Sequence, residues 1–209
     1  MSPLRRAVES VHLATLGLWL GILIATGAAA ALVFPAMKAL DPTLPAYAAF
    51  DRPHWTLAAG HVAERYFRAS DVAQVALAGI AWLTMPIAAA VFGPRRGLPI
   101  VRVGLAGALS ASLAWQLLSL RPQMDLHLSA YRAAAIAGES EVAEAERAAF
   151  AALHPAATRA MAINAALVLF ALAVGTFDAT RPRRDEDAPE DADEEAVQGG
   201  REASQARTD

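Results

Sequence analysis

Long stretches without ionised residues constrain the fold of this chain most strongly. Four windows lack Asp, Glu, Lys and Arg: 28 residues after Glu9, 23 after Asp71, 18 after Arg102 and 18 after Arg159. A charge at the centre of a bilayer costs on the order of 3 kcal/mol, and even 18 helical residues approach the roughly 30 Å hydrocarbon thickness. The windows therefore predict four membrane-spanning helices. They cover about 11–35, 72–92, 103–120 and 160–177.

Basic residues are distributed unevenly around these windows, and this sets the expected orientation. The two long connections, 38–71 and 121–159, together carry 8 basic and 9 acidic residues. The other flanks are rich in arginine, at Arg5, Arg6, Arg95, Arg96, Arg102, Arg181, Arg183 and Arg184. Short basic flanks stay in the cytoplasm. Both termini are therefore expected on the cytoplasmic side of a bacterial inner membrane, with the two long connections outside.

The connections and the tail differ in composition from the windows. Helix is expected at Thr56–Phe67, and again from Ser140, where several acidic residues suit the start of a helix. Residues 178–209 hold 5 basic and 11 acidic residues without apolar periodicity, which predicts disorder. The expected fold is all-α: an integral membrane four-helix bundle over 11–177, preceded by a cytoplasmic segment at 1–10. Its extracytoplasmic loops are expected to be helical, and its acidic tail to be cytoplasmic.

Small residues recur every four positions in two of the windows. They are Gly17, Gly21 and Ala25 in the first window and Gly104 and Ala108 in the third. Helices in lipid associate by close backbone approach, so both stripes predict helix packing. Three amides, Gln74, Gln116 and Asn164, also lie within the windows. They are candidates for hydrogen bonds between helices, or for a polar track that a solute follows.

Four of the five histidines fall on the expected outer side of the membrane. His61 and Glu64 are three residues apart and would share a helical face, and His127 follows Met124 by three residues. Together with His154 they form a candidate metal site, and imidazole with a thioether suits copper. Histidine also serves as a hydrogen-bonding residue at membrane interfaces, which is the structural alternative.

Several functional classes are excluded by what the chain lacks. It contains no cysteine, so disulfides, thiol catalysis and cysteine-based metal sites are ruled out. No phosphate-binding loop, HExxH helix or GxSxG elbow occurs, and no catalytic residue is assigned. The basic residues are not interleaved with aromatic ones, which argues against nucleic acid as a partner. No cofactor is expected.

Short motifs along the chain resemble a known family. They are His12-Leu13, Leu18-Trp19-Leu20-Gly21, Phe34-Pro35, Ala59-Gly60-His61-Val62, Arg121-Pro122, Phe150-x-x-Leu153-His154 and Asn164. Over about residues 10–177 this pattern resembles the family called domain of unknown function 4149, which is similar to transmembrane protein 205. The resemblance implies a four-span integral membrane protein and supplies no reaction. Family members often have a small polar residue after the histidine, whereas this chain has Pro155.

These observations lead to one leading hypothesis and two alternatives. The leading hypothesis is a non-enzymatic multi-pass inner-membrane protein with a structural, partner-binding or small-solute role. Its partners would be the lipid bilayer and either a second copy of the chain or another membrane protein. The first alternative is a protein for metal handling or membrane redox chemistry that uses the outer histidines. The second is a transporter subunit with a polar track formed by Gln74, Gln116 and Asn164.

Overall fold

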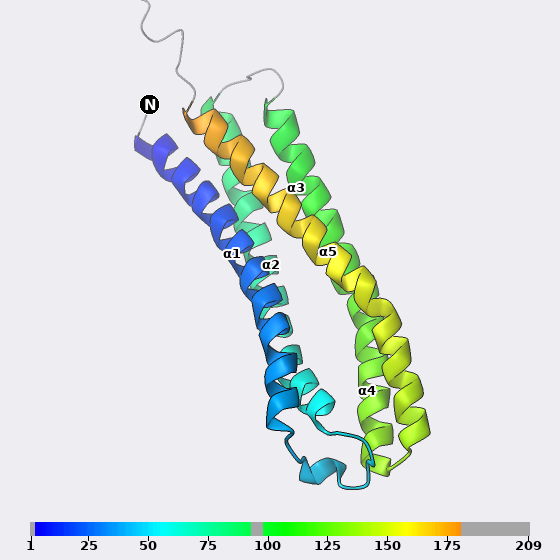
Figure 1. Ribbon diagram of the computed structural model, residues 1–209. Coiled ribbons are helices and arrows are strands. Elements are labelled where there is room, and N and C mark those ends of the chain that lie inside the picture. Colours follow the sequence, from blue (N-terminus) through cyan, green and yellow to red (C-terminus); the bar gives the residue numbers. More distant parts are fainter. Residues whose placement is uncertain (1–2, 93–97, 181–209) are drawn as a thin grey trace, which may run out of the picture. The chain divides into compact units, whose positions relative to one another are not determined.

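The computed structural model describes residues 3–92 and 98–180, with side chains throughout except at Arg5 and at 86–92, 98 and 99 (Figure 1). Every regular element in these residues is a helix, which confirms the all-α class. In chain order they are α1 (Pro3–Leu40), η1 (Pro45–Tyr47), α2 (Trp55–Phe92), α3 (Leu98–Trp115), η2 (Gln116–Leu120), α4 (Arg121–Ala137) and α5 (Ser140–Thr180). The chain divides into two compact units, Met1–Thr176 and Phe177–Asp209, and all contacts discussed below lie within the first.

Three helical segments of the described residues are long and apolar enough to cross a membrane. They are Arg6–Leu40, Ile100–Ala137 and Ser140–Thr180. These segments contain the expected spans 11–35, 103–120 and 160–177. The expected span at 72–92 lies within α2. This helix is also unbroken, but it is not among the three segments that are long and apolar enough to cross a membrane. The sequence therefore located the apolar helices, and the membrane role of α2 needs a separate argument.

The helices continue well beyond the charge-free windows. The helix expected at Thr56–Phe67 is the first part of α2, and the helix expected from Ser140 is the first part of α5. Pro155 lies inside α5 without ending it. Helical loops were expected, and the described residues show that these helices extend into the apolar segments without a break. Of the acidic tail expected at 178–209, residues 178–180 still belong to α5, and residues 181–209 lie outside the described residues.

One apolar core holds the middle of the helices together. Leu16, Trp19 and Leu23 of α1 project every three or four residues toward α2, against which α1 packs along its length (Figure 1). The other buried members of this core come from α2, α3 and α5 and are Leu77, Leu109, Leu113 and Val168. The core therefore joins every one of the four long helical segments.

A second core lies around η1 and the ends of α4 and α2. Its buried members are Tyr47, Phe50, Leu57, Tyr131, Ala134, Ala135 and Ala143. Gly138 ends α4 with φ of 75°, and the Glu139 amide donates to the Ala134 carbonyl at 2.9 Å. A Cβ at Gly138 would lie 3.1 Å from Ala49, so the tight turn and the close approach both favour glycine.

The long helices bury several polar side chains and expose many large apolar ones, around cores that are themselves mainly apolar. Among the side chains that the structure describes, seven buried ones are polar or charged: Glu9, His12, Thr15, Thr26, Ser70, Gln74 and Asn164. Large apolar side chains point outward on each long helix, among them Leu18, Ile24, Leu83, Leu118 and Phe170. Only 17–22% of the residues in the three apolar windows are buried. The outer surface of these helices therefore suits an apolar solvent.

The small-residue stripes also lie on this outer surface. Gly17, Gly21 and Ala25 are exposed on α1, and Gly104 and Ala108 are exposed on α3. A Cβ built at any of the three glycines would meet no atom within 4 Å. The stripes were expected to bring helices of the chain together, but the interior face of α1 is formed instead by larger side chains such as Trp19 and Leu23.

Candidate functional site

Six charged residues form an alternating series between α2 and α4, which we call the charge ladder. Its members are Glu64, Arg68 and Asp71 of α2 and Arg121, Asp125 and Arg132 of α4. Glu64 is held on both sides, by Arg132 at 2.6 Å and by Arg68 at 2.8 Å. Its side chain is 20% exposed. Burial raises the pKa of Glu64, but the hydrogen bond and charge of Arg132, and then Arg68, outweigh burial, so the pKa is lowered.

The remaining contacts of the charge ladder are longer. Arg121 stands between two carboxylates, 3.5 Å from Asp71 and 3.6 Å from Asp125. Asp125 in turn lies 3.8 Å from Arg68. Ion pairs at these distances lack the short geometry of the contacts at Glu64, so they are weaker and easier to rearrange. The ion pairs of the charge ladder are therefore short and strong at Glu64, and long and weaker at Asp71.

Asp71 also begins a chain of hydrogen bonds that enters the interior. The Gln116 amide nitrogen donates to the Asp71 carboxylate at 3.5 Å, and the Asn164 amide nitrogen donates to the Gln116 oxygen at 3.3 Å. We call this series from α2 through η2 to α5 the interhelical polar chain. Asn164 is 0% exposed. Two of the three amides found in the charge-free windows are thus brought together.

The direction of the interhelical polar chain follows from Asp71. Gln116 turns its nitrogen toward Asp71 and its oxygen toward Asn164, an orientation that suits an ionised Asp71, which only accepts hydrogen bonds. Burial raises the pKa of Asp71, and the charge of Arg121 opposes this rise in part. Asn164 must then turn its nitrogen toward Gln116. Its Oδ1 atom is buried and accepts no hydrogen bond from the residues that the structure describes. A buried acceptor without a donor costs about 1–3 kcal/mol, so a ligand that donates a hydrogen bond to this atom would remove that cost.

Gln116 is presented by an irregular turn. Residues Gln116–Leu120 form a π-helical turn between α3 and α4, within one uninterrupted helical segment. A π turn inserts a residue into the helical repeat and changes the face on which later side chains lie, and such turns are frequent at functional sites. Here the turn separates the apolar face of α3 from Arg121 and Asp125, which belong to the charge ladder.

The third amide, Gln74, belongs to a different set of contacts. Its oxygen accepts a hydrogen bond from the Trp19 indole at 3.3 Å, and its nitrogen donates to the Ser70 hydroxyl at 3.3 Å. Thr26 donates to the same hydroxyl at 2.9 Å. Gln74 therefore joins α1 to α2 with both ends of its amide satisfied. Gln74 is therefore not hydrogen-bonded to Gln116 or Asn164, although the sequence suggested one polar track for all three amides.

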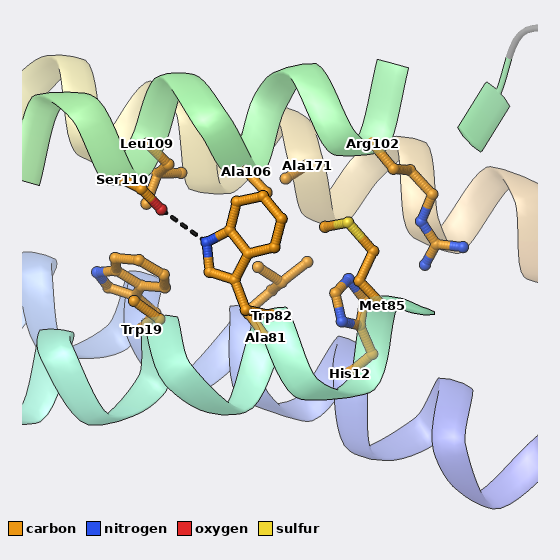
Figure 2. A pocket seen from close by; sticks show the side chains of 12 residues that line it. His12, Trp19, Ala81, Trp82, Met85, Arg102, Ala106, Leu109, Ser110 and Ala171 are labelled. Atoms are coloured by element: carbon orange, nitrogen blue, oxygen red, sulfur yellow. Dashed lines mark hydrogen bonds between the residues drawn. The ribbon is translucent and has the colours of Figure 1, made fainter. Parts of the chain in front are cut away.

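A cavity of about 30 Å³ lies among α1, α2, α3 and α5 (Figure 2). Its walls are mainly apolar, and His12, Arg102 and Ser110 contribute polar groups. The Trp82 indole crosses the space and donates to Ser110 at 2.8 Å (Figure 2). A space of this size holds about one or two water molecules, which excludes a drug-sized ligand in this conformation.

Two buried polar pairs lie beside the cavity. Arg102 donates to Glu9 at 2.6 Å, and their side chains are 11% and 6% exposed. His12 Nδ1 lies 2.8 Å from the Thr84 hydroxyl. Glu9 and Arg102 each stand at the edge of a charge-free window, and their spacing in sequence does not reveal that they meet. The pair therefore joins the N-terminal end of α1 to the N-terminal end of α3.

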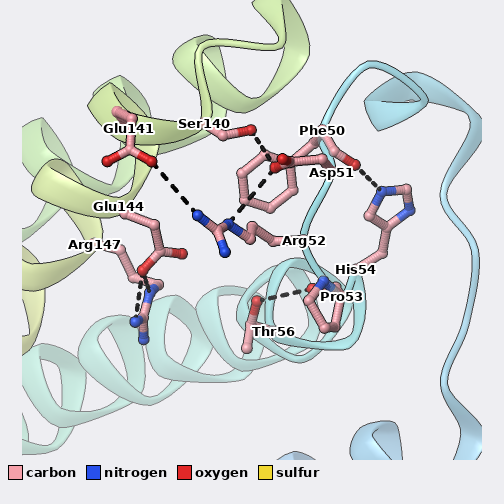
Figure 3. A network of polar contacts seen from close by, with 10 residues as sticks. All are labelled: Phe50, Asp51, Arg52, Pro53, His54, Thr56, Ser140, Glu141, Glu144 and Arg147. Atoms are coloured by element: carbon pink, nitrogen blue, oxygen red, sulfur yellow. Dashed lines mark hydrogen bonds and ion pairs between the residues drawn. The ribbon is translucent and has the colours of Figure 1, made fainter.

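The segment between α1 and α2 is fastened to α5 by a polar network (Figure 3). Ser140 donates to Asp51, and Arg52 lies 3.5 Å from Glu141. His54 accepts a hydrogen bond from the Leu44 amide at 2.9 Å. These contacts hold the segment at 41–54 in place between α1 and α2.

The structure places the candidate metal ligands in separate local contacts. His61 lies 2.8 Å from the Tyr47 hydroxyl, and His127 lies 2.7 Å from Glu146. His154 is exposed, and its ring stacks obliquely near Phe150. Within the described ranges, no three His, Asp or Glu side chains converge as a metal site would require. Burial and the positive charge of Arg132 lower the pKa of His61, so this imidazole is neutral at neutral pH.

The charge ladder and the Glu9–Arg102 pair were not identified from the sequence. A signal for the ladder exists: Glu64, Arg68 and Asp71 are spaced four and three residues apart, and Arg121 and Asp125 are four apart. Each set lies along one face of its helix, and acidic residues of one set can pair with basic residues of the other.

Comparison with protein-family models, curated proteins and solved structures finds no match.

Proposed function

We propose that the chain is an integral protein of a bacterial inner membrane that crosses the bilayer four times as a helical bundle, with both termini in the cytoplasm. The apolar outer surface supports this proposal, because large apolar residues face outward while Glu9, Gln74 and Asn164 are buried. In water such an arrangement would expose apolar surface and desolvate polar groups, and both effects are unfavourable. In lipid the outward apolar side chains carry no such cost, and polar side chains are better placed between the helices, where they find hydrogen-bond partners.

The fourth crossing is assigned to α2. Its charge-free window of 23 residues follows Asp71, and its outward side chains include Val72, Val75 and Leu83. The helix α1 is apolar enough to cross a membrane, and α2 packs along it, so α2 lies in the same lipid environment. The resemblance to domain of unknown function 4149 agrees with four spans, and we propose that the chain belongs to that family.

We further propose that the protein binds a small polar solute and lets it cross the membrane, without catalysing a reaction. One observation carries this proposal: α2, the π turn and α5 meet at the interhelical polar chain, where Asn164 Oδ1 is buried without a hydrogen bond from any described residue. Polar groups inside a membrane protein are costly and mark solute pathways more often than apolar positions do. The charge ladder leads from Asp71 toward the expected outer surface and gives the solute a polar approach.

Permeation through reconstituted protein tests this function. Proteoliposomes containing the full chain are compared with protein-free liposomes for the entry of a panel of small ions and uncharged solutes. At least one solute should enter faster with the wild-type chain, and Asn164→Leu should slow that entry because the buried acceptor is lost. Gln74→Leu makes the same change outside the interhelical polar chain and should keep the wild-type rate. Equal rates in protein-free and protein-containing liposomes across the whole panel would contradict the proposal.

A further inference from the structure

We propose that the solute bound at the interhelical polar chain is a small uncharged molecule that donates hydrogen bonds, such as an amide or a polyol. This inference rests on the solute-binding function proposed above and names its chemical class. Two independent features of the site lead to it: the kind of atom that lacks a partner, and the balance of charge around it.

The first feature is that the site holds two buried atoms without a hydrogen-bond partner among the described residues, the acceptor Asn164 Oδ1 and the donor Arg121 Nη2. Asn164 Oδ1 is buried without a donor, because the direction of the chain from Asp71 through Gln116 fixes the Asn164 nitrogen on the other side. An ionised Asp71 is also an acceptor with room for further donors, since a carboxylate offers about four acceptor positions. A molecule that satisfies Asn164 Oδ1 must therefore carry an N–H or O–H group, and one that also has a carbonyl or hydroxyl oxygen can accept a hydrogen bond from Arg121.

The second feature is that the surrounding charges already cancel. The charge ladder contains three carboxylates and three guanidinium groups, and each charge has a partner of opposite sign within 3.8 Å. A charged solute would leave one uncompensated charge in an environment of low dielectric constant, which is costly. An uncharged solute adds no such cost.

The site also has contacts that a solute can replace. The Gln116–Asp71 and Arg121–Asp71 contacts are both 3.5 Å long, at the limit of hydrogen bonding. If a donor from the solute takes Asp71, Arg121 still lies 3.6 Å from Asp125 and keeps a carboxylate partner. The solute can therefore exchange with existing contacts and leave every charge of the ladder paired.

Urea and guanidinium separate charge from shape, because both are planar, similar in size and rich in N–H donors. Proteoliposomes containing the full chain are mixed with each solute, and entry is followed by stopped-flow light scattering, with a membrane-potential dye for the ion. Glycerol serves as a second uncharged donor. Asn164→Leu removes the unpaired acceptor, and Gln74→Leu is the matched control, since its amide has both partners on Trp19 and Ser70.

We expect urea or glycerol to enter faster with the wild-type chain than without protein, and guanidinium to enter at the protein-free rate. Asn164→Leu should slow the faster entry by about three- to tenfold, the loss that corresponds to one buried hydrogen bond, whereas Gln74→Leu should not. Faster entry of guanidinium or another ion, with none for the uncharged solutes, would overturn this inference and leave the solute-binding function standing. No protein-dependent entry of any solute would overturn both. The wild-type comparison of urea with guanidinium decides the matter even if Asn164→Leu fails to fold.

Discussion

Arg102→Met should destabilise the protein by about 3–5 kcal/mol, the usual cost of removing one partner from a buried ion pair. Arg102 donates to Glu9 at 2.6 Å, and the Glu9 side chain is only 6% exposed. The other carboxylate oxygen of Glu9 is already buried without a hydrogen bond from the described residues. Without Arg102 the carboxylate loses its ion-pair partner in an apolar surrounding, which costs folding free energy. Unfolding in mixed micelles, followed by far-ultraviolet circular dichroism, measures the loss.

A second substitution distinguishes the ion pair from simple packing. Glu9→Gln combined with Arg102→Met removes both charges, so the double variant should recover a large part of the stability lost by Arg102→Met alone. Arg52→Met is a matched control, because Arg52 is 48% exposed and lies 3.5 Å from an exposed Glu141; it should change stability by less than about 1 kcal/mol. Additive losses in the double variant would argue against a buried charge as the cause.

Trp19→Ala should cost about 3–5 kcal/mol, as expected when a large aromatic side chain is removed from a packed interior. Trp19 is 3% exposed and belongs to the apolar core with Leu16, Leu77 and Val168. Its indole also donates to Gln74, so the substitution leaves a buried amide oxygen without its donor. The same unfolding measurement in mixed micelles reports the change.

Two further variants separate these contributions. Trp19→Phe keeps most of the ring volume and loses the indole donor, so it should cost about 1–3 kcal/mol, the penalty of an unpaired buried acceptor. Trp115→Ala removes the same type of side chain from a position that is 49% exposed, and it should cost far less. If Trp115→Ala and Trp19→Ala were equally destabilising, the assignment of Trp19 to the core would be untenable.

The helices themselves were largely predictable. The windows after Glu9, Arg102 and Arg159 coincide with apolar helical segments, because a long run without charge has few alternatives to helix. The extension of α2 and α5 to Trp55 and Ser140 was predicted in part from local residues. The π turn at Gln116–Leu120 was not predicted, since nothing in its composition differs from ordinary helix.

The candidate site was predictable only as a set of unusual residues. Gln116 and Asn164 were singled out because amides are rare in apolar windows, and they are hydrogen-bonded to each other. Their connection to Asp71 could not be derived, since it depends on how far α2 slides along α3 and α5. The outer histidines were singled out by the same kind of reasoning, yet His61 and His127 each have their own partner.

The sequence by itself determined that this protein is helical, where its apolar segments lie and which polar residues they contain. Only the tertiary structure decided which face of each helix is inside. The small stripe at Gly17 and Gly21 lies outside, and Trp19, on another face of the same helix, lies in the core. The physical reason is that most faces of these helices are apolar, so hydrophobicity does not distinguish inside from outside. The rotation of each helix is set by pairs of residues far apart in sequence, such as Glu9 with Arg102 and Gln116 with Asn164.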